Sequence, residues 1–195
     1  IGLAKVRLDN VSISCAVTDA YIDWLPDQRC SMKPRLDVVV APSPAEVFVD
    51  DVTLWPLQDC CGGTTIAVVE EADRGQVVEF NYMTNETVTY FQSASPMDFS
   101  AFTGGTIEFD LLVVNQPEGA WMMKIDCVYP CSTNDVPLTE SVEGVSPPTG
   151  SWQHYTFNID SLVNRTGSSL DLTKVDTPLV IFPAWGSQNL SLIHT

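Results

Sequence analysis

The sequence predicts an all-β protein, either an antiparallel sandwich or a barrel. Val, Thr, Ile, Phe, Tyr and Trp are abundant, whereas long stretches rich in helix-forming Ala, Leu, Glu and Lys are missing. Short segments with partly alternating apolar and polar residues recur at a spacing of roughly ten residues, which leaves no room for crossover helices. Turn-forming Gly, Pro, Asn and Asp separate these segments, as in NQPEG and SPPTG.

Six strand candidates follow one another in the region from residue 63 onward. They are residues 75–83, 87–93, 104–114, 121–129, 151–159 and 177–185. Residues 96–102 and 170–175 are predicted to be short helical or turn insertions at most.

Residues 1–62 are predicted to be an N-terminal strand segment with a linker, and residues 63–195 the sandwich module. Residues 4–14, AKVRLDNVSIS, alternate like a strand whose apolar positions are Val6, Leu8, Val11 and Ile13. Residues 45–55, AEVFVDDVTLW, repeat nearly the same pattern. Because the similarity covers only these short segments, it indicates a duplicated strand and not a repeated domain.

The chain is strongly acidic, with 25 Asp and Glu residues against 9 Lys and Arg and a formal charge of −16. Such a surface repels nucleic-acid phosphates and anionic lipid headgroups, so we expect neither nucleic acid nor a membrane as a partner. No apolar run approaches the roughly 18–20 residues of a membrane helix. We expect most acids to be solvated, the alternative being that some of them bind calcium.

The six cysteines indicate disulfides, and therefore an extracellular or cell-surface location. Without a CxxC pair and with only two His in the chain, a zinc site is disfavoured. The local pairs predicted are Cys127 with Cys131, across a turn at Pro130, and Cys15 with Cys30.

Cys60 and Cys61 are adjacent, and a bridge between neighbours is a strained ring. We therefore expect them to reach the N-terminal pair or another chain. The sequence alone does not choose among the pairings.

Four N-glycosylation sequons agree with an extracellular location, and they include four of the eight Asn residues. The alternative is that strand edges rich in Ser and Thr form sequons by chance. The sequons begin at Asn10, Asn85, Asn164 and Asn189.

Catalysis finds little support in the sequence. The two His residues are His154, which we interpret as a surface imidazole on a strand, and His194 in the C-terminal tail. No spacing indicates a pair of catalytic carboxylates, and no Gly-rich phosphate loop is present. We expect no catalytic residues and no cofactor, apart from a structural calcium.

Four segments of the sandwich region resemble a known family. GGTIEFDLLVV, WMMKIDCVYPCSTNDVPL, GSWQHYTFNIDSLV and LDLTKVDTPLVIFPAWGSQ are similar to the galactose-binding-like C-terminal module of ExoP-type exo-β-glucanases, over about residues 63–188. The most specific segments are KIDCVYPC and LTKVDTPLVIFPAWG. The resemblance implies a β-jelly-roll sandwich without catalytic residues of its own, of a kind that occurs beside secreted polysaccharide-active domains.

The closing strand of the resembled family follows its FPAW-G-x-Q segment, with the form (apolar)-x-(apolar)-D-N-(apolar). This chain carries that pattern at residues 4–14 instead. The strand could fold back onto its own module, as in a circular permutant, or mark a cut through a tandem array. The interpretation that we favour is that it completes a neighbouring copy or module, which predicts head-to-tail assembly.

Sugar binding would need exposed aromatic rings that stack on a pyranose and polar groups that bond its hydroxyls. The aromatic candidates are Tyr90, Trp121, Tyr129 and Trp185, and the polar candidates are Asp126, Asn134, Asp135 and Gln188. Trp152 and Phe157 alternate along one strand candidate and are predicted to lie in the core. Asp9 and Asp50 occupy the position where related jelly rolls often bind a structural calcium, but the interpretation that we favour is an Asp that caps a turn or faces solvent.

The favoured function is therefore that of a non-catalytic extracellular glycoprotein module. It would act as a structural subunit that assembles with copies of itself or adjacent modules, by strand complementation, into a fibre or surface matrix. The alternative is a carbohydrate-binding module that directs a glycoside hydrolase to β-glucan.

Overall fold

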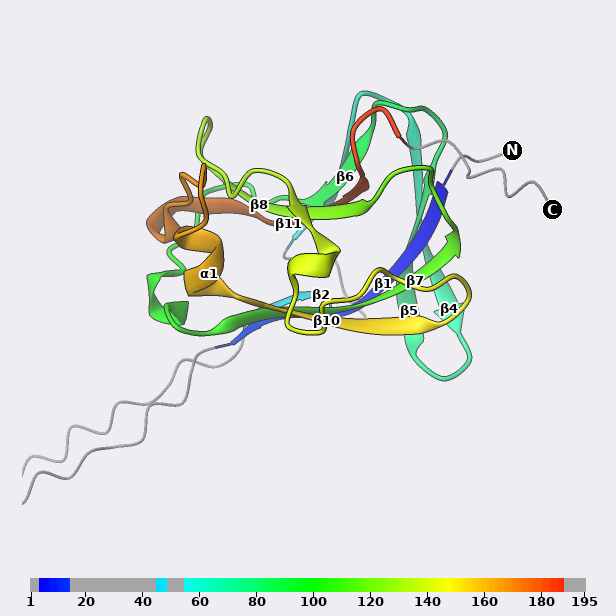
Figure 1. Ribbon diagram of the computed structural model, residues 1–195, viewed down its shortest axis with the longest axis horizontal. Helices are drawn as coiled ribbons and strands as arrows, with labels where there is room; N and C mark the ends of the chain where they lie inside the picture. Colours follow the sequence, from blue (N-terminus) through cyan, green and yellow to red (C-terminus); the bar gives the residue numbers. More distant parts are fainter. Residues whose placement is uncertain (1–3, 15–44, 49–54, 188–195) are drawn as a thin grey trace, which may run out of the picture.

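A computed structural model of the chain describes residues 4–14, 45–48 and 55–187. The described residues form two sheets packed face to face (Figure 1), and all pairings between named strands are antiparallel. The predicted jelly-roll sandwich is confirmed.

Sheet A has the strand order β10-β7-β1-β5-β4, and β2 pairs with the end of β1. Its strands are β1 (Ala4–Ser14), β2 (Ala45–Phe48), β4 (Thr64–Glu71), β5 (Gly75–Tyr82), β7 (Thr106–Asn115) and β10 (Trp152–Asn158).

Sheet B has the order β3-β6-β11-β8-β9. Its strands are β3 (Leu57–Cys60), β6 (Val88–Phe91), β8 (Trp121–Cys127), β9 (Val136–Pro137) and β11 (Val175–Pro183). The helical elements are η1 (Ser100–Phe102), η2 (Leu138–Glu140), α1 (Ile159–Val163) and η3 (Leu172–Lys174), so both predicted insertions contain a short helix. None of the helices in the described part is long and apolar enough to span a bilayer.

The strand β1 lies in the middle of sheet A of its own chain, drawn in blue in Figure 1. One edge pairs with β7, and the other pairs with β5 through Ala4–Leu8 and with β2 through Val11–Ile13. The structure thus has the first of the three arrangements considered above, with the strand in the sheet of its own chain. Both edges of β1 are hydrogen-bonded to described strands, so the position between β5 and β7 is filled by the chain's own strand.

A bulge in β1 lets its apolar side chains face the core. Leu8 and Val11 are three residues apart, so strict alternation would place them on opposite faces of the sheet. The pairing with β7 shifts register between Asp9 and Ser12, and Leu8, Val11 and Ile13 are all buried. The side chain of Val6 lies outside the described residues.

The two sheets are joined through the fully buried Tyr82 of β5. Its hydroxyl donates to the carbonyl oxygen of Ile181 at 2.5 Å and lies 2.9 Å from the hydroxyl of Thr89, and both of these residues belong to sheet B. Burial raises the pKa of Tyr82 well above its ordinary value. The hydroxyl therefore stays neutral and can keep donating across the core.

The two aromatic residues of β10 that were predicted for the core differ in their burial. Phe157 is buried and stacks with Phe109 at a centroid distance of 6.1 Å, as predicted. Trp152 is only partly buried, and the guanidinium carbon of Arg74 lies 4.3 Å from the centroid of its ring. The prediction for Trp152 was therefore wrong, because a cation–π contact shields this ring in place of core packing.

Candidate functional site

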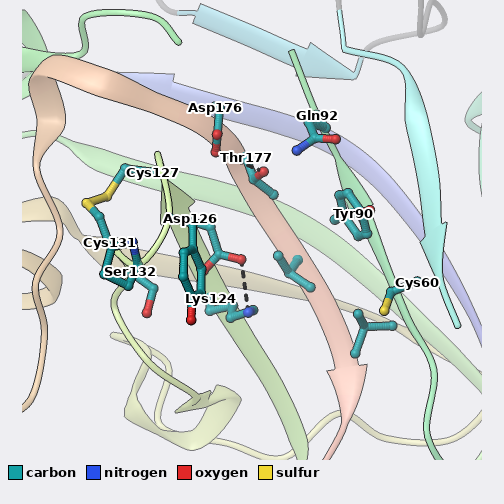
Figure 2. A pocket seen from close by; sticks show the side chains of 14 residues that line it. Cys60, Tyr90, Gln92, Lys124, Asp126, Cys127, Cys131, Ser132, Asp176 and Thr177 are labelled. Carbon is teal, nitrogen blue, oxygen red and sulfur yellow. Dashed lines mark hydrogen bonds and ion pairs between the residues drawn. A yellow bond between two sulfur atoms is a disulfide. The ribbon is translucent and has the colours of Figure 1, made fainter. Parts of the chain in front are cut away.

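A pocket of about 380 Å³ lies on the face of sheet B that points away from the core (Figure 2). This volume is within the range of small-molecule sites. The neighbouring strands β6, β11 and β8 all contribute side chains to it, and so does the loop 127–132. Tyr90 and Gln92 line it from β6 and the turn after it, and Lys124 and Asp126 line it from β8.

Alternation along the strands explains why these side chains point outward. In β8 the buried residues Met123, Ile125 and Cys127 face the core, so Lys124 and Asp126 between them face the pocket. The same rule applies to β6, where buried Thr89 and Phe91 alternate with the pocket residues. The residues from β11 are Asp176, Thr177 and Val180.

Two tyrosines supply the aromatic surface of the pocket. Tyr90 is half-buried on β6, and Tyr129 is 93% exposed on the loop after β8. Within the described part of the chain, neither hydroxyl has a hydrogen-bond partner, and the same holds for the side-chain amide of Gln92. The pocket therefore offers aromatic faces together with polar groups that are available to a ligand.

Asp126 is the least satisfied polar side chain in the pocket. Its Oδ2 accepts from Lys124 Nζ at 2.9 Å, but its Oδ1 is buried without a hydrogen-bond partner among the described residues. Burial raises the pKa of Asp126, the nearby Asp176 and Asp135 raise it further, and Lys124 only partly opposes them. A buried acceptor without a donor costs about 1–3 kcal/mol, so this carboxylate is held in the pocket at a cost to stability.

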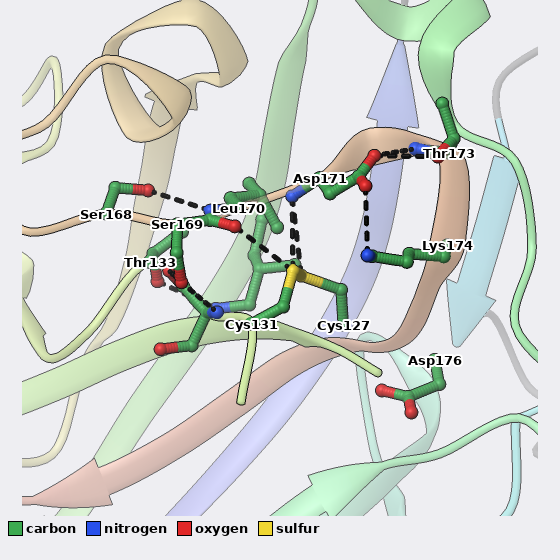
Figure 3. The surroundings of a disulfide bond; sticks show 12 residues. Cys127, Cys131, Thr133, Ser168, Ser169, Leu170, Asp171, Thr173, Lys174 and Asp176 are labelled. Atoms are coloured by element: carbon green, nitrogen blue, oxygen red, sulfur yellow. Dashed lines mark hydrogen bonds and ion pairs between the residues drawn. A yellow bond between two sulfur atoms is a disulfide. The ribbon is translucent and has the colours of Figure 1, made fainter. Parts of the chain in front are cut away.

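The loop that carries Tyr129 is closed by a disulfide between Cys127 and Cys131 (Figure 3), the local pair that the sequence predicts. The backbone N–H of Asp171 points at both sulfur atoms, at 3.4 and 3.3 Å. The backbone N–H of Ser169 donates to the carbonyl of Ser132 at 2.8 Å. The loop is therefore fixed both covalently and to the segment that precedes η3.

Cys60 and Cys61 form a disulfide with each other in the structure, contrary to our expectation that neighbours avoid pairing. Cys61 and Gly62 both have positive φ angles, of 77° and 70°. The tight turn after β3 thus gives the chain the local conformation in which adjacent thiols meet. Cys60 also lines the pocket. Cys15 and Cys30 lie outside the described residues, so their pairing stays a prediction.

The other predicted sugar-binding residues lie elsewhere. Trp121 is 3% exposed, packs on Tyr82 and donates from Nε1 to Gln116 at 3.1 Å, so its ring is not free to stack on a sugar. Trp185 is 51% exposed, on the loop after β11, and does not line this pocket.

The predicted polar candidates Asn134 and Asp135 do not line the pocket. The side chain of Asn134 donates to the carbonyl of Gly167 and so holds a loop, and Asp135 is exposed and reaches Asp126 only through its charge. Gln188 lies outside the described residues. Tyr90, Tyr129 and Asp126 are thus the predicted residues that the structure brings together.

Sequence reasoning missed Lys124, Gln92, Asp176 and Thr177. Lys124 precedes Asp126 by two residues and Gln92 follows Tyr90 by two, so each pair lies on one face of its strand. Extending each candidate by two residues along its strand would have found both.

The sequons and the calcium candidates are only partly described. Asn164 is exposed at the end of α1, Asn85 is half-buried beside β6, and Asn10 lies in β1. Asn189 and Asp50, and the side chain of Asp9, lie outside the described residues. Among the residues that are described, no three His, Cys, Asp or Glu side chains are placed to hold a metal ion. Glycosylation and calcium binding stay predictions.

The outer face of sheet A is covered by paired charges. Asp110 accepts from Arg74 at 2.7 Å and lies 2.8 Å from Nδ1 of His154, a half-exposed imidazole on a strand. A second group joins Glu79 to Lys5 at 3.0 Å and to Arg7 at 3.1 Å.

A family model described as galactose-binding domain-like, Exop_C, matches residues 65–194. The match covers more than half of the chain and almost every residue of the pocket, whereas β1 and β2 lie outside it. No curated protein matches the chain, and no solved structure matches it.

Proposed function

Because the chain belongs to the Exop_C family of galactose-binding-domain-like proteins, we propose that it is a carbohydrate-binding module whose site is the pocket on sheet B. Domains of this kind are typically non-catalytic. The observation that carries the proposal is that Tyr90 and Tyr129 share one pocket with the buried, unpartnered Oδ1 of Asp126.

The chemistry of the pocket suits a pyranose. A sugar ring presents C–H groups on its faces and hydroxyl donors around its edge, so it needs aromatic surface and polar partners side by side. The rings of Tyr90 and Tyr129 supply the surface, and the carboxylate of Asp126 accepts from a hydroxyl. Gln92 and Lys124 can donate to further sugar oxygens.

We further propose that the ligand is a β-glucan and that the module acts outside the cell, directing an attached glycoside hydrolase to its polymer. The two disulfides support an oxidising compartment. The resemblance to modules of exo-β-glucanases supports the choice of polymer.

Assembly by strand complementation has weaker support, because β1 would have to leave the centre of its own sheet. Sedimentation over a wide range of protein concentrations separates the two functions. A chain that stays monomeric throughout is expected for the carbohydrate-binding role, and polymers that grow with concentration would favour assembly.

Calorimetric titration with laminarin and mixed-linkage β-glucan tests the proposed function. We expect saturable binding that Tyr90→Ala weakens at least about tenfold, since the loss of an aromatic stacking surface exceeds about 1.4 kcal/mol. Trp185→Ala is the matched control, because it removes an exposed aromatic ring outside the pocket. Absence of binding to both polymers, or binding that depends on Trp185 and not on Tyr90, would overturn the proposal.

A further inference from the structure

We propose that the pocket on sheet B selects sugars that carry a protonated amine, as in β-linked glucosamine polymers, over neutral and anionic sugars of the same linkage. The inference rests on the proposed function and adds the charge class of the ligand. It follows from the balance of charges in the pocket and from what each charged group already contacts.

Acidic groups outnumber basic ones in the pocket. Asp126 and Asp176 are its carboxylates, and Lys124 is its only cation among the described residues. Since Lys124 Nζ already pairs with Asp126 Oδ2 at 2.9 Å, one carboxylate remains without a counter-ion. Asp135 lies close enough to act on Asp126 as a third negative charge. The charged side chains that line the pocket therefore sum to one net negative charge, with Asp135 nearby and itself acted on by Arg165.

Asp126 is the carboxylate at which a cation would be most stabilised, because Lys124 pairs with only one of its oxygens and the other has no hydrogen-bond donor among the described residues. A hydroxyl donor would give this carboxylate one neutral hydrogen bond, whereas an ammonium adds opposite charge where partial burial has removed water. Burial and the neighbouring acids raise the pKa of Asp126, so a nearby cation would favour its ionised form.

The same charges disfavour anionic ligands. A uronate or sulfated sugar would bring a negative charge close to Asp126 and Asp176, with only the engaged Lys124 to compensate. The net charge of −16 on the chain adds a long-range repulsion that weakens with salt.

Oligosaccharides that differ only in one substituent test the inference. Chitosan, cellulose and N-acetylated chitin oligomers share the β-1,4 linkage and differ at C2, where they carry an ammonium, a hydroxyl and an acetamide. We expect the chitosan oligomer to bind about tenfold more tightly than the cellulose oligomer at pH 6 and 0.15 M salt, the difference between a charged and a neutral hydrogen bond. The acetamide should lose that advantage.

Two matched variants decide whether the preference belongs to the pocket. Asp126→Asn should abolish the preference, because the side chain keeps its shape and loses its charge. Asp73→Asn removes one charge from the exposed turn between β4 and β5 and should leave the preference unchanged. A preference that survives both Asp126→Asn and the double change Asp126→Asn with Asp176→Asn would overturn the inference, since it would come from the overall charge of the chain.

The outcomes separate this inference from the proposed function. Suppose that the chitosan and cellulose oligomers bind with equal affinity and that Tyr90→Ala abolishes the binding of both. That result overturns the amine preference and leaves the carbohydrate site in place. No binding of any oligomer or glucan overturns both.

Discussion

The two outer faces of the sandwich both carry charged side chains but satisfy them in different ways. On sheet A, Asp110 is engaged by both Arg74 and His154, and Glu79 is engaged by two cations. On sheet B, Asp126 has a single ion pair and a buried oxygen without a partner. Carboxylates that are satisfied within the chain stabilise it, and one that is left incomplete can instead be completed by a ligand. Removing a carboxylate charge should therefore lower the free energy of unfolding on sheet A and raise it at Asp126 on sheet B.

The largest effect is expected from Asp110→Ala on sheet A. The change removes a carboxylate that holds Arg74 at 2.7 Å and His154 at 2.8 Å. Hydrogen bonds to charged groups contribute about 1.5–3 kcal/mol each, and partial exposure reduces this, so we expect the free energy of unfolding to fall by about 3 kcal/mol. Urea denaturation at pH 7 measures it. A fall below about 0.5 kcal/mol would mean that these pairs do not stabilise sheet A.

Opening the Cys127–Cys131 disulfide should have the next largest effect. Replacing both residues by Ala releases a five-residue loop, for which the loop-closure relation gives about 2 kcal/mol. Because the loop carries Tyr129, glucan binding should weaken as well. The paired replacement of Cys60 and Cys61 by Ala releases a smaller loop and should cost less stability. Equal losses in the two double variants would contradict the special role of the 127–132 loop.

The substitution Asp126→Asn should stabilise the fold by about 1 kcal/mol at pH 7 while it weakens ligand binding. The pKa of Asp126 is raised, so its ionisation costs stability that is intact below the ordinary Asp pKa. The advantage of the Asn variant should thus grow as the pH rises through the raised pKa. Chemical denaturation at pH 3, 5 and 7 would show this, and a variant less stable than the parent at pH 7 would contradict it.

Glu79→Gln should have the smallest effect, and with the opposite pH dependence. Although burial raises the pKa of Glu79, hydrogen bonds from Lys5 and Arg7 hold it below its usual range overall. Its contribution is therefore present above the ordinary Glu pKa and is lost as the pH falls through the lowered one. We expect a loss of about 0.5–1 kcal/mol at pH 7 that vanishes near pH 3. A loss that is the same at both values would show that charge is not its source.

Most of the strands that were predicted have one clearly buried side, while β11, which is buried along nearly its whole length, was predicted from its continuous apolar run. β5, β7, β8 and β10 alternate in sequence as they do in burial. β4 was not predicted, since it is an edge strand whose residues are all exposed or only half-buried and whose pattern carries little signal. The placement of β1 in cis depends on pairing between distant segments, which local pattern does not encode.

The candidate site was partly predictable for the same reason. Asp126 and Tyr129 stand out because a charged residue and an aromatic ring adjoin the Cys127–Cys131 loop. Trp121 has the same local appearance, but its contact with Tyr82 across the core depends on how the sheets pack. Sequence identifies which residues have suitable chemistry, and only the packing decides which of them face outward.

The position of β1 also separates the evolutionary unit from the folding unit. The family match spans residues 65–194, yet the strand between β5 and β7 comes from residues 4–14. A shortened chain cut to the family boundaries would have two unpaired strand edges and an open core where Leu8, Val11 and Ile13 now lie. Folding of the family-matched region therefore depends on a segment more than fifty residues before it in the chain, so a boundary drawn from the family match alone would cut through the hydrophobic core.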